Sequence, residues 1–162
     1  MEKTLIDIAY YKTPIGIAKI EGNADGIIAV SVIDDEVSPS GKIPVSLQEC
    51  VWQLKEYFEK KRTNFDLKLN PQGTEFQKKV WKELQRIPYG KTISYLDQSK
   101  RMKSPKAIRA IASANGKNPV WIIIPCHRVI GSDGSLTGYA GGIWRKKWLL
   151  EYESPSNQTT LF

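Results

Sequence analysis

Histidine and cysteine are scarce in this chain. Its 162 residues include one histidine, His127, and two cysteines, Cys50 and Cys126. A structural zinc site usually takes four Cys or His ligands, so three such residues argue against one. We therefore expect no bound metal.

Long apolar runs are absent as well. No segment approaches the ~20 consecutive apolar residues of a membrane span. The N-terminal Met-Glu-Lys-Thr-Leu lacks the apolar stretch of a secretory signal. Hydrophobic residues still make up 41% of the chain, which suits a packed core. With so few cysteines, these features predict a reduced, cytoplasmic protein that acts away from membranes.

Acidic residues are scarce in the second half of the chain. Residues 1–73 carry 9 Lys/Arg and 11 Asp/Glu, a net −2, whereas residues 74–162 carry 15 and 6, a net +9. A half this basic is typical of a protein that binds a polyanion, most simply nucleic acid. This change in net charge follows the segment Asn-Pro-Gln-Gly, which is typical of a linker. We predict an N-terminal domain at 1–73, a second domain at 74–153 and a polar tail at 154–162.

The first domain is predicted to be a small β-sheet covered by a helix. Apolar runs at 4–10 and 15–20 flank a Lys-Thr-Pro turn signal, and 26–33 has the composition of a third strand. Ser46 and Glu49 have capping-box spacing and predict the start of the helix. The predicted buried face of that helix carries apolar residues at helical spacing: Leu47, Val51, Leu54 and Phe58.

The second domain is predicted to be helical. Thr74 and Gln77 form another capping-box pattern. A short helix is expected near 94–101, with Ser94 as its cap. Ser104-Pro105 predicts a third helix, with a cap followed by proline in the first turn. The outward face of that third helix carries Lys106, Arg109 and Ser113. Two short helices with such a face indicate a helix-turn-helix.

The fold class predicted from these patterns is α/β (α+β). A small sheet-and-helix domain comes first, and a helical domain with a winged-helix or helix-turn-helix motif follows it.

The segment Ile-Pro-Cys-His-Arg-Val carries the clearest chemical signal, because it places Cys126 beside His127. A thiol becomes a nucleophile when a nearby base or positive charge favours the thiolate. The apolar run 120–124 predicts a strand that leads to this pair. The loop at 131–142 holds five glycines and Tyr139, whose ring can stack on a planar base. On Cys126 and His127 alone, a Cys–His hydrolase is as plausible as any other function.

Several motifs, in order and spacing, resemble the O6-alkylguanine-DNA alkyltransferases (methylated-DNA–protein-cysteine methyltransferases). Besides the Pro-Cys-His-Arg segment, they are Pro-Tyr-Gly-Lys-Thr-Ile-Ser-Tyr at 88–95, Pro-Lys-Ala-Ile-Arg-Ala at 105–110, Asn-Pro at 118–119, Gly-Tyr-Ala-Gly-Gly at 138–142 and Trp-Leu-Leu-Glu-Tyr-Glu at 148–153. The resemblance covers 74–153, whereas 1–73 resemble the family's N-terminal domain only in general layout.

The resemblance implies direct-reversal DNA repair without a cofactor. Cys126 would take the alkyl group from O6-alkylguanine, and also from O4-alkylthymine, and each molecule would act once. His127 would act as a base through a bridging water, and Glu153 would orient it and support the imidazolium. Tyr95 would donate a hydrogen bond to the departing guanine, and Asn118 would brace the active-site turn.

The resemblance also implies how DNA is held. The target base must leave the duplex stack, and Arg109 would fill the space that it vacates. The helix that carries Arg109 would lie in the minor groove, where the small side chain of Ala110 permits close approach. Lys106 and Ser113 would contact the DNA from the same face.

A pocket for the flipped base is the last implication for the second domain. Its expected members are Tyr139, Ala140, Val129, Trp121 and Gly138. Trp121 stands where the family usually has a proline, and Ala140 stands where many relatives have serine or another polar residue. These departures leave the width and polarity of the pocket open.

The tail ends Gln-Thr-Thr-Leu-Phe and resembles the C-terminal sliding-clamp-binding motif of archaeal repair proteins. Gln158 matches the glutamine of that motif, Leu161 matches its leucine, and Phe162 supplies only part of its aromatic pair. The expected partners are therefore double-stranded DNA that contains O6-alkylguanine, and a sliding clamp. We expect a monomer in a prokaryotic, and on this motif archaeal, cytoplasm.

Two alternatives lie outside enzymatic repair. A non-catalytic binder of alkylated DNA is disfavoured because such proteins lack the cysteine that Cys126 provides. A regulator that senses alkylation is disfavoured because the chain has no evident effector domain.

Overall fold

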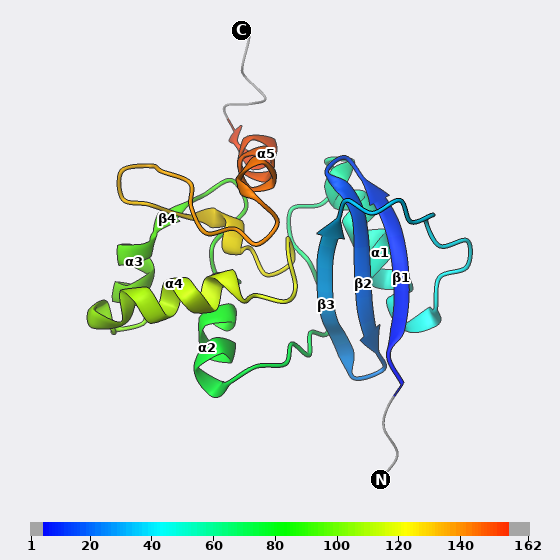
Figure 1. Cartoon of the computed structure of the whole chain (residues 1–162), viewed down its shortest axis with the longest axis horizontal. Coiled ribbons are helices and arrows are strands. Elements are labelled where there is room, and N and C mark those ends of the chain that lie inside the picture. The colour runs from blue at the N-terminus through cyan, green and yellow to red at the C-terminus, as the bar shows by residue number, and fades with distance from the viewer. Residues whose placement is uncertain (1–4, 156–162) are drawn as a thin grey trace, which may run out of the picture. The chain divides into compact units, whose positions relative to one another are not determined.

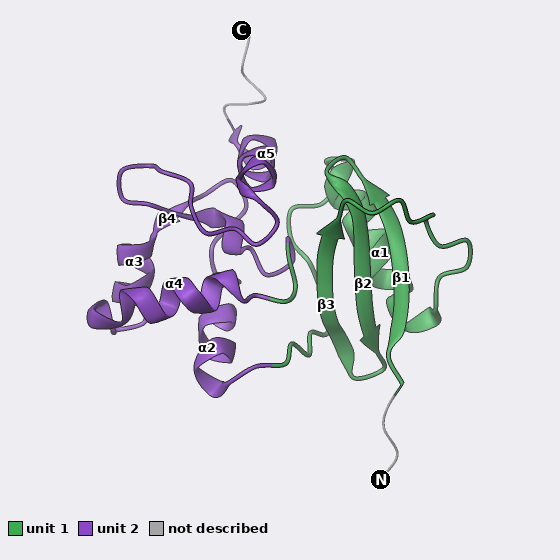
Figure 2. Cartoon of the chain, in the orientation of Figure 1, with its two compact units in different colours: residues 1–72, 119–121 green, residues 73–118, 122–162 purple. Residues whose placement is uncertain are grey.

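The computed structural model describes residues 5–155, which fall into two compact units (Figures 1 and 2). The first unit is built from the chain up to residue 72 together with 119–121, and the second from 73–118 and from residue 122 onward. Within 5–155, no helix is long and apolar enough to cross a membrane.

The first unit is a three-stranded antiparallel sheet with a helix on one face (Figure 1). Its strands are β1 (Asp7–Thr13), β2 (Gly16–Asn23) and β3 (Gly26–Ile33), with β2 in the middle. The helix α1 (Val45–Phe58) packs against all three strands. The predicted sheet covered by a helix is thus confirmed. Its buried residues include Ala9, Ala18, Ile20, Val30, Val32, Leu47 and Leu54.

The predicted capping box at Ser46 is wrong. The helix α1 begins directly after Pro44, and no side chain caps its first turn. Ser46 lies inside the helix, where its hydroxyl donates a 2.6 Å hydrogen bond to the Asp7 carboxylate. Serine side chains often choose such a competing partner, so the spacing alone did not determine the cap. The buried face also differs from the prediction and consists of Leu47, Cys50, Gln53, Leu54 and Tyr57.

Residues 119–121 pair with the sheet of the first unit. Val120 forms a parallel bridge with Val30. The Val30 amide donates to the Pro119 carbonyl over 2.9 Å, and the Trp121 amide donates to the Val30 carbonyl over 2.8 Å. Local patterns do not reveal this pairing, because the partners lie ninety positions apart.

The strand predicted at 120–124 is wrong. Only Val120 pairs with a strand, and the chain then turns at Ile122, whose φ is +72°. A branched residue rarely adopts a positive φ, and that angle ends an extended segment. Ile122 and Ile124 are fully buried. An uninterrupted apolar run therefore predicted burial correctly but could not distinguish a strand from a buried turn.

The second unit contains four α-helices within the described residues. They are α2 (Glu75–Leu84), α3 (Tyr95–Arg101), α4 (Ile108–Gly116) and α5 (Ile143–Glu153). The predicted capping box before α2 is confirmed, because the Thr74 hydroxyl accepts from the Gln77 amide and the Gln77 side chain accepts from the Thr74 amide. Ser94 caps α3 as predicted.

The third predicted helix begins differently from the expectation. A single 3₁₀ turn, η1 (Pro105–Ala107), precedes α4, and the Ser104 side chain does not cap it. The Ser104 hydroxyl instead donates to the Met102 carbonyl over 3.3 Å. The helix is present, but its first turn is tighter than an α-helix.

The helices α3 and α4 are joined by a buried pair of amide side chains. Gln98 and Asn115 exchange two hydrogen bonds of 2.8 and 2.7 Å. Trp81 on α2 donates its indole N–H to the Ala114 carbonyl over 2.9 Å. These directional bonds fix α4 against both neighbours, and so they fix which of its side chains face outward.

The remaining elements of the second unit are short. The two-residue strands β4 (Ile93–Ser94) and β5 (Val129–Ile130) pair in parallel. A 3₁₀ turn, η2 (Cys126–Arg128), directly precedes β5, and α5 packs against it. This pairing brings the start of α3 close to the Cys-His-Arg segment.

Candidate active site

Cys126 lies in the 3₁₀ turn η2 and is 8% exposed. Asn118 donates from its amide nitrogen to the Cys126 sulfur over 3.2 Å and to the Ile124 carbonyl over 2.8 Å. One side chain thus braces the turn and bonds the sulfur. Burial raises the pKa of the Cys126 thiol, while the Asn118 hydrogen bond and the positive charge of Lys146 act in the opposite direction. A thiol in this setting reacts best when a neighbouring base accepts its proton.

His127 and Glu153 form a buried pair. The His127 Nε2 lies 2.9 Å from Glu153 Oε2, and both side chains are at most 2% exposed. The structure therefore brings the predicted nucleophile, base and carboxylate into one unit of the fold. It places Glu153 at the last turn of α5, twenty-six residues beyond the histidine.

Arg128 also binds Glu153, a contact that the sequence reasoning missed. Its Nε donates to Oε1 over 2.8 Å and its Nη2 donates to Oε2 over 3.0 Å. Burial alone would raise the pKa of Glu153, but the charges and hydrogen bonds of His127 and Arg128 hold that pKa well below its usual range. The carboxylate is therefore ionised at neutral pH. Arg128 lies inside the Cys-His-Arg motif. A basic residue at this place was the signal in the sequence that could have predicted the contact.

The contacts of His127 assign its tautomer. An ionised carboxylate accepts hydrogen bonds, so Nε2 carries the proton when it faces Glu153. The other ring nitrogen, Nδ1, is buried and has no hydrogen-bond partner among residues 5–155. A neutral ring with its proton on Nε2 has a free lone pair on Nδ1. That nitrogen is the one able to accept a proton.

Tyr95 belongs to a second cluster in the same unit. Its hydroxyl donates to the Thr137 carbonyl over 3.1 Å, and the Lys146 ammonium donates to the same carbonyl over 2.8 Å. Lys146 also lies 3.4 Å from the Tyr95 hydroxyl. Burial lowers the pKa of Lys146 to about 8, although the facing Cys126 acts in the opposite direction. The cluster places a cation within electrostatic reach of the sulfur and of the phenol.

Lys146 was missing from the predicted site. It is 1% exposed and lies on α5 with Leu149 and Glu153, at helical spacing. A lysine at helical spacing from a buried leucine and from the predicted site carboxylate was a signal that the sequence contained. Its neighbour Arg145 is also buried and donates to the Gly141 carbonyl over 3.0 Å. Two side chains from the first turn of α5 thus donate hydrogen bonds to carbonyls of the glycine-rich loop.

The predicted base-pocket residues are only partly brought together. Tyr139 and Val129 are buried in the second unit. Gly138 adopts φ +68°, and a side chain there would meet the Tyr95 hydroxyl at 3.6 Å. Ala140 is exposed in the same loop. Trp121, in contrast, donates its amide to the Val30 carbonyl of β3 and belongs to the first unit.

The predicted DNA-contacting residues share one exposed surface of η1 and α4. Arg109, Ala110 and Ser113 are exposed on α4, and Lys106 is exposed on the 3₁₀ turn before it. Ile111, Ala114 and Asn115 form the buried side of the helix. The helix is thus amphipathic in the orientation that the sequence predicted. The clamp-motif residues Gln158, Leu161 and Phe162 lie outside the described residues.

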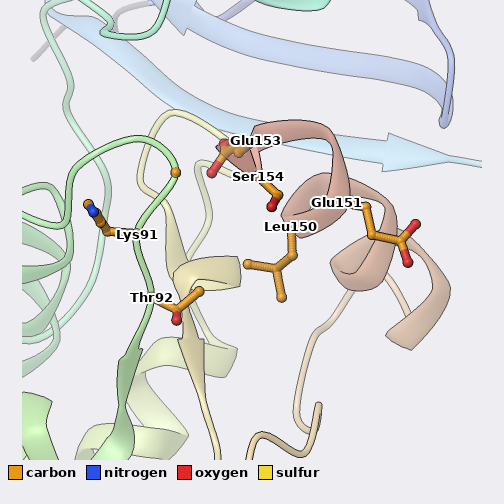
Figure 3. A pocket seen from close by; sticks show the side chains of 7 residues that line it. Lys91, Thr92, Leu150, Glu151, Glu153 and Ser154 are labelled. Atoms are coloured by element: carbon orange, nitrogen blue, oxygen red, sulfur yellow. The ribbon is translucent and has the colours of Figure 1, made fainter. Parts of the chain in front are cut away.

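A pocket of about 330 Å³ lies beside the end of α5 (Figure 3). Its lining comes from the 90–92 turn and from the last turns of α5, and it reaches Glu153 but neither Cys126 nor Tyr139. It is therefore separate from the space in front of the sulfur. Within 5–155, no group of three or more Cys, His, Asp and Glu side chains could hold a metal ion.

Comparison with protein families matches nearly the whole chain. Residues 75–155 match the family described as 6-O-methylguanine DNA methyltransferase, DNA binding domain. Residues 6–71 match the family described as 6-O-methylguanine DNA methyltransferase, ribonuclease-like domain.

Individual relatives match this chain over most of their own length. A methylated-DNA--protein-cysteine methyltransferase of Mycolicibacterium paratuberculosis is 40% identical over 96% of this chain and 98% of its own. A methylated-DNA--protein-cysteine methyltransferase of Methanosarcina mazei is 46% identical over 88% of this chain and 93% of its own. The crystal structure of Mycobacterium tuberculosis OGT in complex with DNA is 41% identical over 93% of this chain and 96% of its own, with a TM-score of 0.80.

We predict that Glu153→Gln lowers the free energy of unfolding at pH 7 by about 3–5 kcal/mol, because it leaves the buried Arg128 charge unpaired. The pKa of Glu153 is depressed in the folded state, so its stabilisation is fully present above the unfolded pKa of about 4.3 and is lost as pH falls through the lower folded value. The difference between the two proteins should therefore shrink below about pH 4. Urea unfolding at pH 7 and pH 3 measures both effects.

The matched control is Glu151→Gln on the same helix, whose side chain is 64% exposed. It should leave the urea midpoint unchanged at both pH values. Equal stability of Glu153→Gln and Glu151→Gln at pH 7 would contradict the buried ion pair.

Proposed function

We propose a role for each residue of this site from one premise: the chain belongs to the 6-O-methylguanine DNA methyltransferase family. The protein repairs DNA by direct reversal, and it transfers an alkyl group from an alkylated base to one of its own cysteines. It is a methylated-DNA–protein-cysteine methyltransferase in its activity. We assign the acceptor to Cys126. The observation that carries this assignment is the buried sulfur held by Asn118 in the turn that also carries His127.

In the proposed reaction, the Cys126 sulfur attacks the alkyl carbon of O6-alkylguanine. A sulfur–carbon bond forms as the carbon–O6 bond breaks, and the electron pair of the broken bond stays on the guanine. The thiol proton passes through a water to His127 Nδ1, the nitrogen that its tautomer leaves free to accept. The product on the protein is a thioether, which is a poor leaving group, so each molecule reacts once.

The departing guanine needs a proton or a strong hydrogen bond, because it would otherwise leave as an anion. Tyr95 is the proposed donor. Its hydroxyl already lies beside the Lys146 ammonium, which favours negative charge on the phenol oxygen and so assists donation. The same ammonium favours the Cys126 thiolate. Lys146 therefore supports charge at both ends of the transfer.

DNA is the partner, and we propose that the outward face of α4 contacts it. Arg109 would occupy the space of the flipped base, and Ala110 would permit close approach of the helix to the groove. Lys106 and Ser113 would bond the phosphates beside it. The net +9 of residues 74–162 supports DNA binding by this part of the chain. A related structure, that of the Mycobacterium tuberculosis protein, is a complex with DNA.

The flipped base is proposed to lie against Tyr139, with Val129, Gly138 and Ala140 around it. Buried Tyr139 offers an aromatic face for stacking. Gly138 keeps the approach to Tyr95 free of a side chain. Alkylated guanine is the proposed main substrate, and O4-alkylthymine a second one.

We further propose that the protein acts as a monomer in a prokaryotic cytoplasm. One chain supplies the whole Cys–His–Glu network, so catalysis needs no second copy. The relatives named above are bacterial and archaeal.

Transfer of the methyl group to Cys126 is the first test. Incubation with a duplex that contains O6-methylguanine, followed by digestion and mass spectrometry, should find the methyl group on the Cys126 peptide. Cys126→Ala should show no transfer. Cys50→Ala is the matched control and should retain it, because Cys50 is buried in the first unit and burial raises its pKa to about 12. Methyl on neither cysteine of the unsubstituted protein would overturn the function.

The rate of transfer should fall as the pH rises through about 8, where Lys146 loses its charge. Lys146→Met should be about tenfold or more slower at pH 7 and should lack this alkaline decline, because the charge that it loses is absent throughout. Single-turnover rates at saturating duplex measure both effects. Lys147→Met, with a 67% exposed side chain on the same helix, is the control and should keep the decline. An unchanged rate in Lys146→Met would exclude the role.

We also propose that the C-terminal tail binds a sliding clamp through Gln158, Leu161 and Phe162, on the sequence resemblance alone. Deletion of 157–162 should abolish binding to the clamp of the same organism in a calorimetric titration, while methyl transfer on free duplex continues. Unchanged affinity after the deletion would rule the tail out as the binding segment.

A further inference from the structure

The carboxylate of Glu153 has two bonding partners rather than one. Arg128 occupies both of its oxygens at 2.8 and 3.0 Å, and His127 Nε2 shares Oε2 at 2.9 Å. In a triad without such an arginine, the carboxylate keeps its full negative charge for the histidine. Here the guanidinium already balances that charge. The proposed function does not require this arrangement, so the arginine calls for its own explanation.

The position of Arg128 is over-determined. Its Nη1 donates to the Ile87 carbonyl over 2.7 Å, and the guanidinium lies 5.8 Å from the Tyr89 ring centre. The residue is 6% exposed, and the donors Nε, Nη1 and Nη2 all have acceptors. A forked donor fixed at two further points holds a carboxylate in one orientation. Arg128 is therefore placed to determine where the Glu153 oxygens point.

We propose that Arg128 is a positioning residue of alkyl transfer, which acts through Glu153 to set the tautomer of His127 and to limit how strongly the carboxylate stabilises the imidazolium. Oε2 is held toward Nε2, so the ring proton stays there and Nδ1 stays free. Because the Arg128 guanidinium balances the charge of Glu153, the carboxylate stabilises an imidazolium less than an unpaired carboxylate would. The inference rests on the proposed function of Cys126 and His127.

Other ionisable groups that face Glu153 do not replace this effect. From the turn after α2, Tyr89 lies near the carboxylate, and from the glycine-rich loop, Tyr139 does so. Burial raises the pKa of both phenols, so both are neutral in the range where histidine titrates. Arg128 is bonded to the carboxylate through two nitrogens, and His127 is bonded to it through one.

The chain offers a direct readout, because His127 is its only histidine. With ¹⁵N-labelled histidine, NMR reports the tautomer and the titration midpoint of the His127 ring. The signals need no assignment, because the labelled protein contains one histidine. The second readout is the acid limb of the pH–rate profile for single-turnover methyl transfer to Cys126. Both are measured in the full chain, in the unsubstituted protein and in the variants Arg128→Gln, Arg128→Lys and Arg128→Gln with Glu153→Gln.

Arg128→Gln keeps a hydrogen-bond donor and removes the charge. Glu153 then becomes an unbalanced counter-ion, so we expect the NMR midpoint and the acid limb to move up by about one pH unit, which slows transfer about tenfold on that limb. Arg128→Lys keeps the charge, so its NMR midpoint and its acid limb should lie close to those of the unsubstituted protein. The double variant replaces the neutral ion pair by two neutral amides, so it should also restore the original midpoint.

A purely structural arginine would behave differently. The melting temperature would fall, yet the pH profile and the NMR midpoint of the folded protein would stay in place, and this result would overturn the proposal. If Arg128→Gln does not fold, Arg128→Lys and the double variant decide it, because a midpoint far from the original in either contradicts charge balance. Absence of methyl transfer in the unsubstituted protein would instead refute the proposed function, and the NMR readout would still test Arg128.

Discussion

The buried carboxylate of Glu153 is the interaction on which the second unit depends. It lies at the end of α5, and its two partners, His127 and Arg128, lie in the turn η2. A buried charge is costly unless it is paired and hydrogen-bonded, and both of its oxygens have donors here. The same contacts that satisfy the carboxylate thus join α5 to the turn that carries Cys126. The contacts that stabilise this part of the fold therefore also hold His127 in place.

Around this carboxylate, separate short segments supply the side chains of the proposed site. Asn118 reaches the sulfur from the chain that follows α4, and Tyr95 comes from the first residue of α3. Lys146 comes from the first turns of α5, and the Thr137 carbonyl comes from the glycine-rich loop. Each segment is too short to be stable alone, and each is held by hydrogen bonds to the others. Such a site has little freedom to move, which suits a cysteine that reacts once with a bulky substrate.

Local patterns in the sequence predicted much of this unit. The capping box at Thr74, the cap at Ser94 and the outward face with Arg109 were readable because each depends on residues within one or two turns. The failures share a cause. Ser46 bonds Asp7 across the fold, and the run 120–124 becomes a turn with one residue paired to β3. Those outcomes depend on partners far along the chain, which periodicity does not detect.

The sequence by itself determined that Cys126 and His127 are neighbours, that the second half is basic, and that the chain belongs to a family of alkyl acceptors. Only the tertiary structure decided what surrounds them. It placed Arg128 on both oxygens of Glu153, Lys146 beside Tyr95, and Trp121 with the sheet of the first unit. The physical reason is that reactivity depends on burial and on charges a few ångströms away. Residues distant in sequence supply those charges, and only folding brings them near the sulfur and the imidazole.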